Sequence, residues 1–199
     1  MLKIVCFLLV TSVYSQGIVK DNFIYVFNRS TDLKREYIAK DFNQIDTLST
    51  HIGIGFKTKE GYHIYNVSND KFIDGTALIV ESLESFISIE NISYYSIWKI
   101  QLKSKEFLKF KKVLKYYKGK EVTFDYHFTL KNDNRLYCSE FVYNVLNDVD
   151  DVRFFFKPKT VELNPFYASA LKREVFKYIP VDFFQTLGIF IKIEERYIN

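Results

Sequence analysis

Strand-like and helix-like segments are interleaved in this chain without a regular order, and this mixture limits the fold more than any other feature of the sequence. Hydrophobic periodicity and β-branched or aromatic runs distinguish the two kinds of segment. Strands are predicted at 23–27, 50–57, 61–67, 95–102, 123–129 and 188–194, and helices at 76–87, 104–118, 138–146 and 164–177, with 32–42 helical or loop and 180–187 a turn and short helix. The absence of a regular β–α alternation favours an α+β fold with an antiparallel sheet over a doubly wound one.

The composition is that of a globular domain. Of 199 residues, 48% are hydrophobic and only 7 are Gly and 3 Pro, which excludes disordered, collagen-like and low-complexity chains. No run of Pro, Gly or Ser divides the sequence and no internal repeat is visible, so residues 16–199 are expected to form a single domain. The net charge of +4 is too small to indicate a nucleic-acid partner.

The first fifteen residues have the pattern of a secretory signal peptide. Lys3 precedes a short apolar run at 4–10, and Ser15 provides a small residue before the expected cleavage point. The run is too short to span a bilayer, so no stable membrane span is expected and the protein is predicted to be secreted or periplasmic. Cleavage would remove Cys6 and leave Cys138 as a single thiol, which must then be buried or functional.

The segment 104–118 is the clearest helix of the sequence. Ser104 is a suitable N-cap residue and Gly119 a suitable stop. Apolar residues recur at helical spacing and are expected to face the core, namely Phe107, Phe110, Leu114 and Tyr117. The lysines between them are expected on a solvated face.

Cys138 lies where a polar turn at 131–135 becomes a helix. Backbone N–H groups and the helix dipole at such a position favour the thiolate, which is the reactive form of the side chain. The alternative is a small buried residue that packs the start of the helix. The chain has three His and neither C-x-x-C nor H-E-x-x-H spacing, so no zinc site is expected, and no Gly-rich phosphate loop is present. A Cys–His pair for nucleophilic catalysis remains as the candidate chemistry.

His51 opens a strand in which alternate residues have different character. Ile52, Ile54 and Phe56 share one face, whereas the His51 face carries only glycines beyond the imidazole, at positions 53 and 55. Glycines within a strand mark the close approach of another chain segment or a ligand, so space for a helix start or a substrate is expected beside the imidazole. His127, between two aromatic residues, is expected to be structural.

A third polar group is needed to orient the imidazole, and the pairing register with the next strand decides its identity. A four-residue loop at 58–61 places Asn66 on the His51 face. A three-residue loop at 59–61 places His63 there instead. Both loops suit a terminal Gly, so the residues alone leave both choices open.

Several stretches resemble the YiiX-like branch of the circularly permuted papain-fold hydrolases, relatives of the NlpC-type cell-wall amidases. The resemblance is carried by the runs HIGI at 51–54, YHIYNV at 62–67, FD at 124–125, YCSEFV at 137–142 and IPVDF at 179–183. It implies a circularly permuted papain-like fold in which an antiparallel sheet packs against helices. It also implies Cys138 as nucleophile, His51 as base and Asn66 where many relatives have Glu. Lipid-acyltransferase relatives use a second His whose spacing His63 matches, and Tyr137 neighbours the expected oxyanion site.

The expected function is an exported thiol hydrolase of the amidase or peptidase type that acts on an amide bond in a peptide or cell-wall fragment. The alternatives are a lipid-acyl ester hydrolase or acyltransferase with the same site, and an inactive binding module with the same fold. No cofactor or metal and no nucleic-acid partner is expected; the partner is a peptide, cell-wall or lipid-like substrate. Glycosylation sequons occur at Asn28, Asn66 and Asn91, and modification of Asn66 would contradict its implied role.

Overall fold

A computed structural model describes residues 22–31, 36–69, 76–88, 92–131 and 134–198, so the predicted signal peptide at 1–15 lies outside the described residues. The elements follow in the order β1 (Phe23–Arg29), α1 (Glu36–Phe42), β2 (His51–Thr58), β3 (Gly61–Val67), β4 (Leu78–Glu81), α2 (Leu83–Ile87), β5 (Tyr94–Gln101), α3 (Ser104–Lys118), β6 (Thr123–Phe124), β7 (Arg135–Leu136), α4 (Cys138–Val149), β8 (Lys159–Glu162), α5 (Pro165–Leu171), β9 (Val175–Tyr178), a 3₁₀ helix (Phe183–Leu187) and β10 (Ile191–Tyr197). None of the helices within the described ranges is long and apolar enough to cross a membrane.

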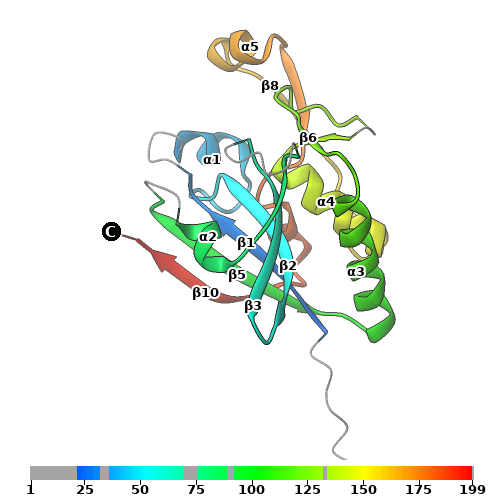
Figure 1. Cartoon of the computed structure of the whole chain (residues 1–199). Coiled ribbons are helices and arrows are strands. Elements are labelled where there is room, and N and C mark those ends of the chain that lie inside the picture. The colour runs from blue at the N-terminus through cyan, green and yellow to red at the C-terminus, as the bar shows by residue number, and fades with distance from the viewer. Residues whose placement is uncertain (1–21, 32–35, 70–75, 89–91, 132–133, 199) are drawn as a thin grey trace, which may run out of the picture.

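A six-stranded sheet organises the described part of the chain, in the order β10-β5-β1-β2-β3-β4 (Figure 1). Each neighbouring pair in this sheet is antiparallel. The predicted α+β architecture with an antiparallel sheet is therefore confirmed. Two small two-stranded sheets, β6-β7 and β8-β9, lie outside it.

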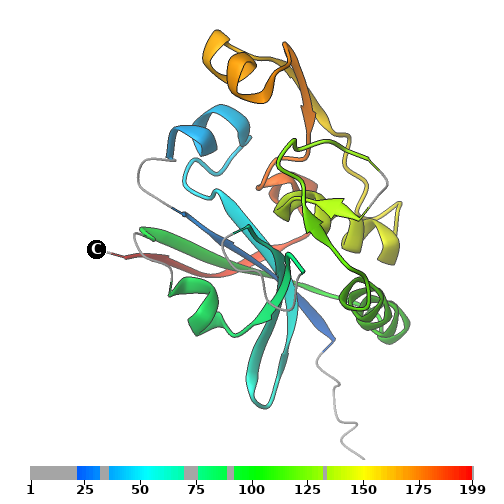
Figure 2. The ribbon, with the colours of Figure 1, turned by 45° about the horizontal axis from the view of Figure 1, so that its top comes forward.

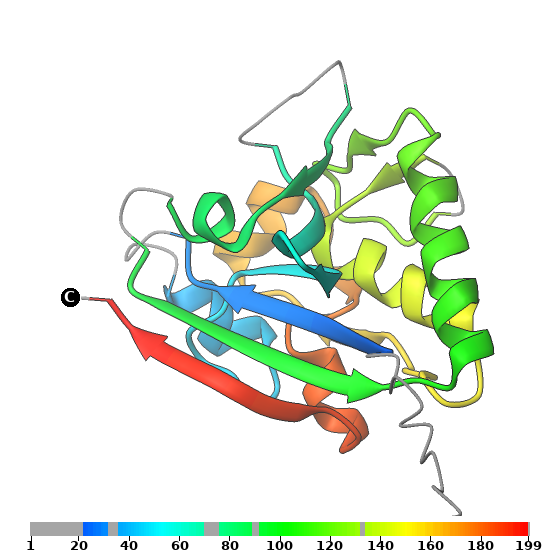
Figure 3. The same ribbon diagram turned by 60° about the horizontal axis from the view of Figure 1, so that its bottom comes forward.

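The two faces of the sheet bury different side chains. Ile24 and Val26 of β1 join the main core beneath α3 and α4, which lie side by side along one face (Figure 3). Tyr25 and Phe27 point to the other face, where they pack with Phe86 of α2. This alternation follows from the two-residue period of a strand, and it gives the two faces of β2 and β3 different neighbours as well.

A hairpin of β8 and β9 carries α5 away from the sheet (Figures 1 and 2). Asn164 caps α5 by accepting a hydrogen bond from the Tyr167 N–H at 3.0 Å, and Lys172 ends the helix in a left-handed conformation with φ of 51°. The prediction of one helix over 164–177 is therefore wrong in its second half. Residues 175–178 instead pair with β8, so strand pairing overrides the local helical pattern.

The prediction of a helix over 76–87 is also wrong in its first part, and only residues 83–87 are helical. Residues 78–81 form β4 and pair with β3, and α2 begins only after Ser82, whose hydroxyl accepts the Ser85 N–H at 3.2 Å. The β-branched run Ile79–Val80 fits a strand, and a capping serine marks the true start of the helix. Consequently Glu81 lies at the end of a strand beside Asn66.

Two smaller predictions need correction. Lys103 and not Ser104 is the N-cap of α3; the Ser104 hydroxyl accepts a hydrogen bond from the Asn22 side chain at 3.0 Å. The predicted strand at 123–129 ends after Phe124, because the Asp125 carboxylate accepts the backbone N–H groups of His127 and Thr129 and closes a turn.

The glycines of β2 accommodate its neighbour β3. A Cβ atom added to Gly53 would lie 2.7 Å from the Ile64 side chain, and one added to Gly55 would collide with the backbone of His63. Close approach at these glycines was predicted, and the approaching segment is the adjacent strand. The space over these two glycines is therefore occupied by β3 and not by a helix start or a ligand.

Gly55→Ala should lower the free energy of unfolding by about 1–3 kcal/mol, because the added methyl group forces β2 and β3 apart. Gly119→Ala is the matched control, since a Cβ there meets nothing closer than 3.6 Å. Urea unfolding followed by circular dichroism measures both changes. Equal stabilities of the two variants would contradict the close approach of the strands.

Candidate active site

The side chain of Cys138 lies at the first residue of α4, after the N-cap Tyr137. It carries a free thiol that is partly exposed and lines a pocket. The backbone N–H groups of Ile52, Ser139 and Cys138 itself are directed at the sulfur. The thiol thus lies beside the beginning of β2, against the residue that follows His51.

The electrostatic state of this thiol differs from the sequence expectation. Burial raises the pKa of the Cys138 thiol above its ordinary value, although the N–H groups of Ile52 and Ser139 act in the opposite direction. The expected donors at the helix start are present, but loss of hydration outweighs them. The protein therefore holds a protonated thiol at neutral pH, and a base must remove its proton when it reacts.

His51 is buried and hydrogen-bonded to Asn66, with 2.9 Å between its Nε2 and Oδ1 of the amide. Burial lowers the pKa of the imidazole to about 3, and the nearby Arg29 guanidinium acts in the same direction, while the bond to Asn66 opposes them. Arg29 is itself buried and pairs with His51 across the β1–β2 ladder. The imidazole is therefore neutral at physiological pH and can accept a proton.

The observed register places Asn66 next to His51. Lys57 pairs with Tyr62 and Phe56 with His63, which is the register expected for the four-residue loop at 58–61. The observed turn is shorter, because Thr58 and Gly61 also pair and only Lys59 and Glu60 lie between the strands. His63 lies on the opposite face, where it stacks on Phe56 with ring centroids 5.6 Å apart and bonds to the Thr58 hydroxyl at 3.0 Å. The structure thus brings Asn66, and not His63, to the imidazole.

The other two predicted residues have clear positions. The Tyr137 hydroxyl accepts the backbone N–H of Ile179 at 2.9 Å, and its ring lines the pocket beside Cys138. It therefore ties the C-terminal segment to the start of α4, and a part in oxyanion stabilisation stays a prediction. His127 is exposed, and its backbone N–H donates to Asp125 at 2.9 Å.

Sequence reasoning missed two polar residues of this region. Glu81 accepts a hydrogen bond from Nδ2 of Asn66 at 2.9 Å. The Arg29 guanidinium lies over the Phe86 ring, 5.1 Å from its centroid. Recognising Ser82 as an N-cap would have started the helix at Leu83 and left Glu81 outside it. No local sequence signal predicts that an arginine in an apolar strand, such as Arg29, is buried.

The pocket beside the thiol is mostly apolar and has a volume of about 290 Å³. Part of its wall comes from α1 and the start of α4. The rest comes from α5 and β9, which belong to the arm formed by β8, α5 and β9. The lining includes the apolar side chains of Ile38, Phe42, Phe128, Phe166, Ala170, Leu171, Phe176 and Val181. A site of this composition suits an apolar ligand group held next to the sulfur.

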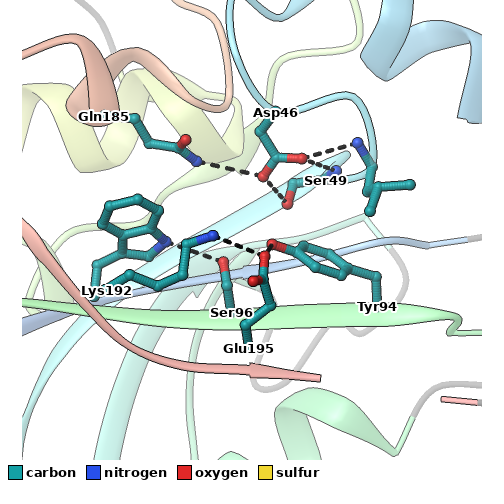
Figure 4. Close-up of polar contacts among 9 residues, drawn as sticks. Asp46, Ser49, Tyr94, Ser96, Gln185, Lys192 and Glu195 are labelled. Carbon is teal, nitrogen blue, oxygen red and sulfur yellow. Dashed lines mark hydrogen bonds and ion pairs between the residues drawn. The ribbon is translucent and has the colours of Figure 1, made fainter. Parts of the chain in front are cut away.

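Carboxylates hold the loop that leads into β2. Asp182 accepts the backbone N–H groups of residues 44–46 at 2.8, 2.5 and 3.0 Å. Asp46 in turn accepts the N–H and the hydroxyl of Ser49 at 2.9 and 2.5 Å and the Gln185 amide at 3.4 Å (Figure 4). These bonds fix the residues directly before His51, and they anchor the loop to the 3₁₀ helix region.

Two of the three sequons are inaccessible in the folded protein. Asn28 has none of its surface exposed and Asn66 only 1%. Asn91 lies outside the described residues. The folded state therefore offers neither Asn28 nor Asn66 for modification.

The structure is similar to the crystal structure of the metalloprotein YiiX from Escherichia coli O157:H7, with a TM-score of 0.62 and 15% sequence identity over 87% of this chain and 97% of that one. No family model matches the sequence, and neither does any curated protein. The resemblance to YiiX seen in the sequence is confirmed at the level of fold.

The stability of the protein should fall on acidification below pH 6.5. The folded state keeps His51 neutral down to a pKa of about 3, whereas the unfolded chain takes up a proton near 6.5, so unfolding is favoured by about 1.4 kcal/mol per pH unit between these values. His51→Gln should remove this contribution to the slope, and His127→Gln, at an exposed position, should keep it. Urea unfolding at pH 7, 5.5 and 4 measures the slopes; identical slopes in wild type and His51→Gln would contradict the assignment.

Proposed function

We propose that this protein is an exported thiol hydrolase with a circularly permuted papain-like architecture. In this proposal Cys138 is the nucleophile, His51 the base and Asn66 the orienting residue, and the substrate contains an amide bond of a peptide or cell-wall fragment. Export rests on the signal-peptide pattern at residues 1–15. The observation that carries the proposal is the oriented imidazole, 2.9 Å from Asn66, on the strand whose next residue, Ile52, meets the sulfur.

The reaction would begin with a neutral pair. Nδ1 of His51 takes the proton of the Cys138 thiol while the sulfur attacks the carbonyl carbon and the carbonyl π electrons move to oxygen. The imidazolium then gives its proton to the leaving nitrogen as the carbon–nitrogen bond breaks. Water, deprotonated by His51, attacks the acyl-enzyme, and the thiol re-forms as the carboxylic acid leaves.

The backbone at the start of α4 suits the developing negative charge. The first N–H groups of a helix have no partner within it, and those of Cys138 and Ser139 point toward the sulfur region. An oxyanion formed beside the sulfur would accept hydrogen bonds from such donors. These N–H groups do not lower the pKa of Cys138 enough to offset burial in the resting protein. They can still stabilise the negative charge that develops in the transition state.

A second candidate function is hydrolysis or transfer of an apolar acyl group from an ester. The observation that favours it is the apolar pocket of about 290 Å³ that reaches Cys138. Each buried methylene contributes about 0.8 kcal/mol to binding, so a pocket of this kind would select long acyl chains over acetate. The catalytic residues would be the same, and only the leaving atom would be oxygen.

The described residues do not fit a metal centre. YiiX of Escherichia coli is described as a metalloprotein. Within the described ranges of this chain, no group of three or more His, Cys, Asp or Glu side chains could hold a metal ion. His51 directs its Nε2 at an amide oxygen of Asn66, which leaves it bonded to protein. The proposed reaction assigns no step to a metal ion.

Hydrolysis of p-nitrophenyl decanoate, p-nitrophenyl acetate and N-acetyl-dialanine p-nitroanilide tests the proposal. We expect Cys138→Ala and His51→Ala to lose on the order of a thousandfold or more in kcat with whichever probe is turned over, because both remove a reacting group. His127→Ala is the matched control and should retain activity. Turnover by Cys138→Ala at the wild-type rate would refute the mechanism, and an absence of Cys138-dependent turnover of every probe would favour a binding module.

Filling the pocket separates the two substrate classes. Ala170 lines it from α5, whereas the neighbouring Ser169 does not. Ala170→Trp should lower kcat/KM for the decanoate ester on the order of tenfold or more relative to the acetate ester, because the indole displaces the acyl chain. Ser169→Trp should leave this ratio unchanged. An unaltered ratio in Ala170→Trp would show that acyl chains bind elsewhere.

A further inference from the structure

Four polar side chains form one chain of hydrogen bonds that ends at the proposed base. His51 Nε2 lies 2.9 Å from Asn66 Oδ1, Asn66 Nδ2 donates to Glu81 Oε1 at 2.9 Å, and the Ser85 hydroxyl donates to Glu81 Oε2 at 2.6 Å. Asn66 is almost completely buried, and His51 is 7% exposed. This series of hydrogen bonds therefore runs from β2 through β3 to β4 and α2.

The direction of these bonds follows from Glu81. An ionised carboxylate only accepts hydrogen bonds, so the group of Asn66 that faces it must be the NH₂ donor. The carbonyl oxygen of Asn66 then faces His51 and accepts, which requires the proton of the neutral imidazole to be on Nε2. Nδ1 is left with a lone pair, as a base that takes a thiol proton requires.

We infer that Glu81 is a positioning residue that fixes the tautomer of His51 through Asn66; this inference rests on the proposed function. Without an acceptor at Glu81, the Asn66 amide can rotate and direct its NH₂ group at Nε2. The imidazole would then carry its proton on Nδ1, and that nitrogen could not accept the proton of Cys138.

The local structure holds the carboxylate in place. Glu81 pairs with Ile64 across the β3–β4 ladder, so its side chain shares a face with Asn66, two residues farther along β3. The Ser85 hydroxyl engages the second oxygen from the first turn of α2, which Ser82 caps. The carboxylate is thus oriented from both sides by elements whose positions are set by strand pairing and by a helix cap.

Two substitutions at this position separate orientation from simple packing. Glu81→Met has a similar size but no strong acceptor, so it should release the amide. Glu81→Gln keeps an oxygen that can accept from Asn66 and an NH₂ group that can donate to Ser85, so it should preserve the orientation. Glu84→Met, at an exposed position on α2, is the matched control.

Nitrogen-15 NMR of the protein labelled in histidine reports the tautomer directly, because a protonated and a bare ring nitrogen have different chemical shifts. We expect His51 to be a single Nε2–H tautomer in wild type, Glu81→Gln and Glu84→Met, and a mixture or the Nδ1–H tautomer in Glu81→Met. A wild-type Nδ1–H tautomer would overturn the inference without the need for any variant.

Turnover of the p-nitrophenyl esters gives the second readout. In Glu81→Met we expect kcat to fall on the order of tenfold or more with KM nearly unchanged, and Glu81→Gln to recover most of this loss. A single Nε2–H tautomer in a folded Glu81→Met protein would overturn the positioning role and leave the proposed hydrolase intact. Tautomer changes as expected, in a protein without Cys138-dependent turnover of any probe, would support the positioning of the ring and favour a binding module over the hydrolase.

Discussion

The close approach of β3 to β2 is the constraint on which the site depends. Gly53 and Gly55 leave no Cβ atoms between the strands, and Ile64 and the backbone of His63 occupy that space. The pairing register that results places Asn66 on the His51 side and His63 on the other. A shift by one residue would exchange the two faces of β3 and turn the Asn66 amide away from the proposed base.

Burial sets the resting charge of the site. Removal from water favours the uncharged forms of both proposed reacting groups, raising the pKa of Cys138 and lowering that of His51, and Arg29 adds to the second effect. The site is therefore not a preformed thiolate–imidazolium pair. In the proposed reaction, the N–H groups at the start of α4 and the hydrogen bond to Asn66 would stabilise the charge separation that a bound substrate requires.

The sequence predicted the parts of the site that have a local signal. The polar turn followed by an amphipathic segment located Cys138 at a helix start, and strict alternation after His51 identified its strand and its faces. The sequence could not choose between Asn66 and His63, because the register depends on how closely two strands approach. Glu81 was hidden in a segment predicted as one helix, since its strand character comes from pairing with β3 and not from local propensity.

The arm formed by β8, α5 and β9 is a second place where local sequence propensity did not predict the structure. Residues 175–178 have an acceptable helical pattern, yet their partners in β8 make them a strand. The pocket depends on this arm, because α5 and β9 supply part of its wall. Its apolar character is visible in the sequence only as a high content of Phe and Tyr, which does not reveal where those rings meet.

The burial of Asn28 and Asn66 has a consequence for biosynthesis. Each begins an N-x-S sequon inside a strand, and the serines of both motifs are buried as well. In a compartment with oligosaccharyltransferase, the enzyme could reach these asparagines only while the nascent polypeptide is still extended. Strand assembly and glycan attachment would then compete for the same side chains, and a sugar on Asn66 would trap a chain unable to close its sheet.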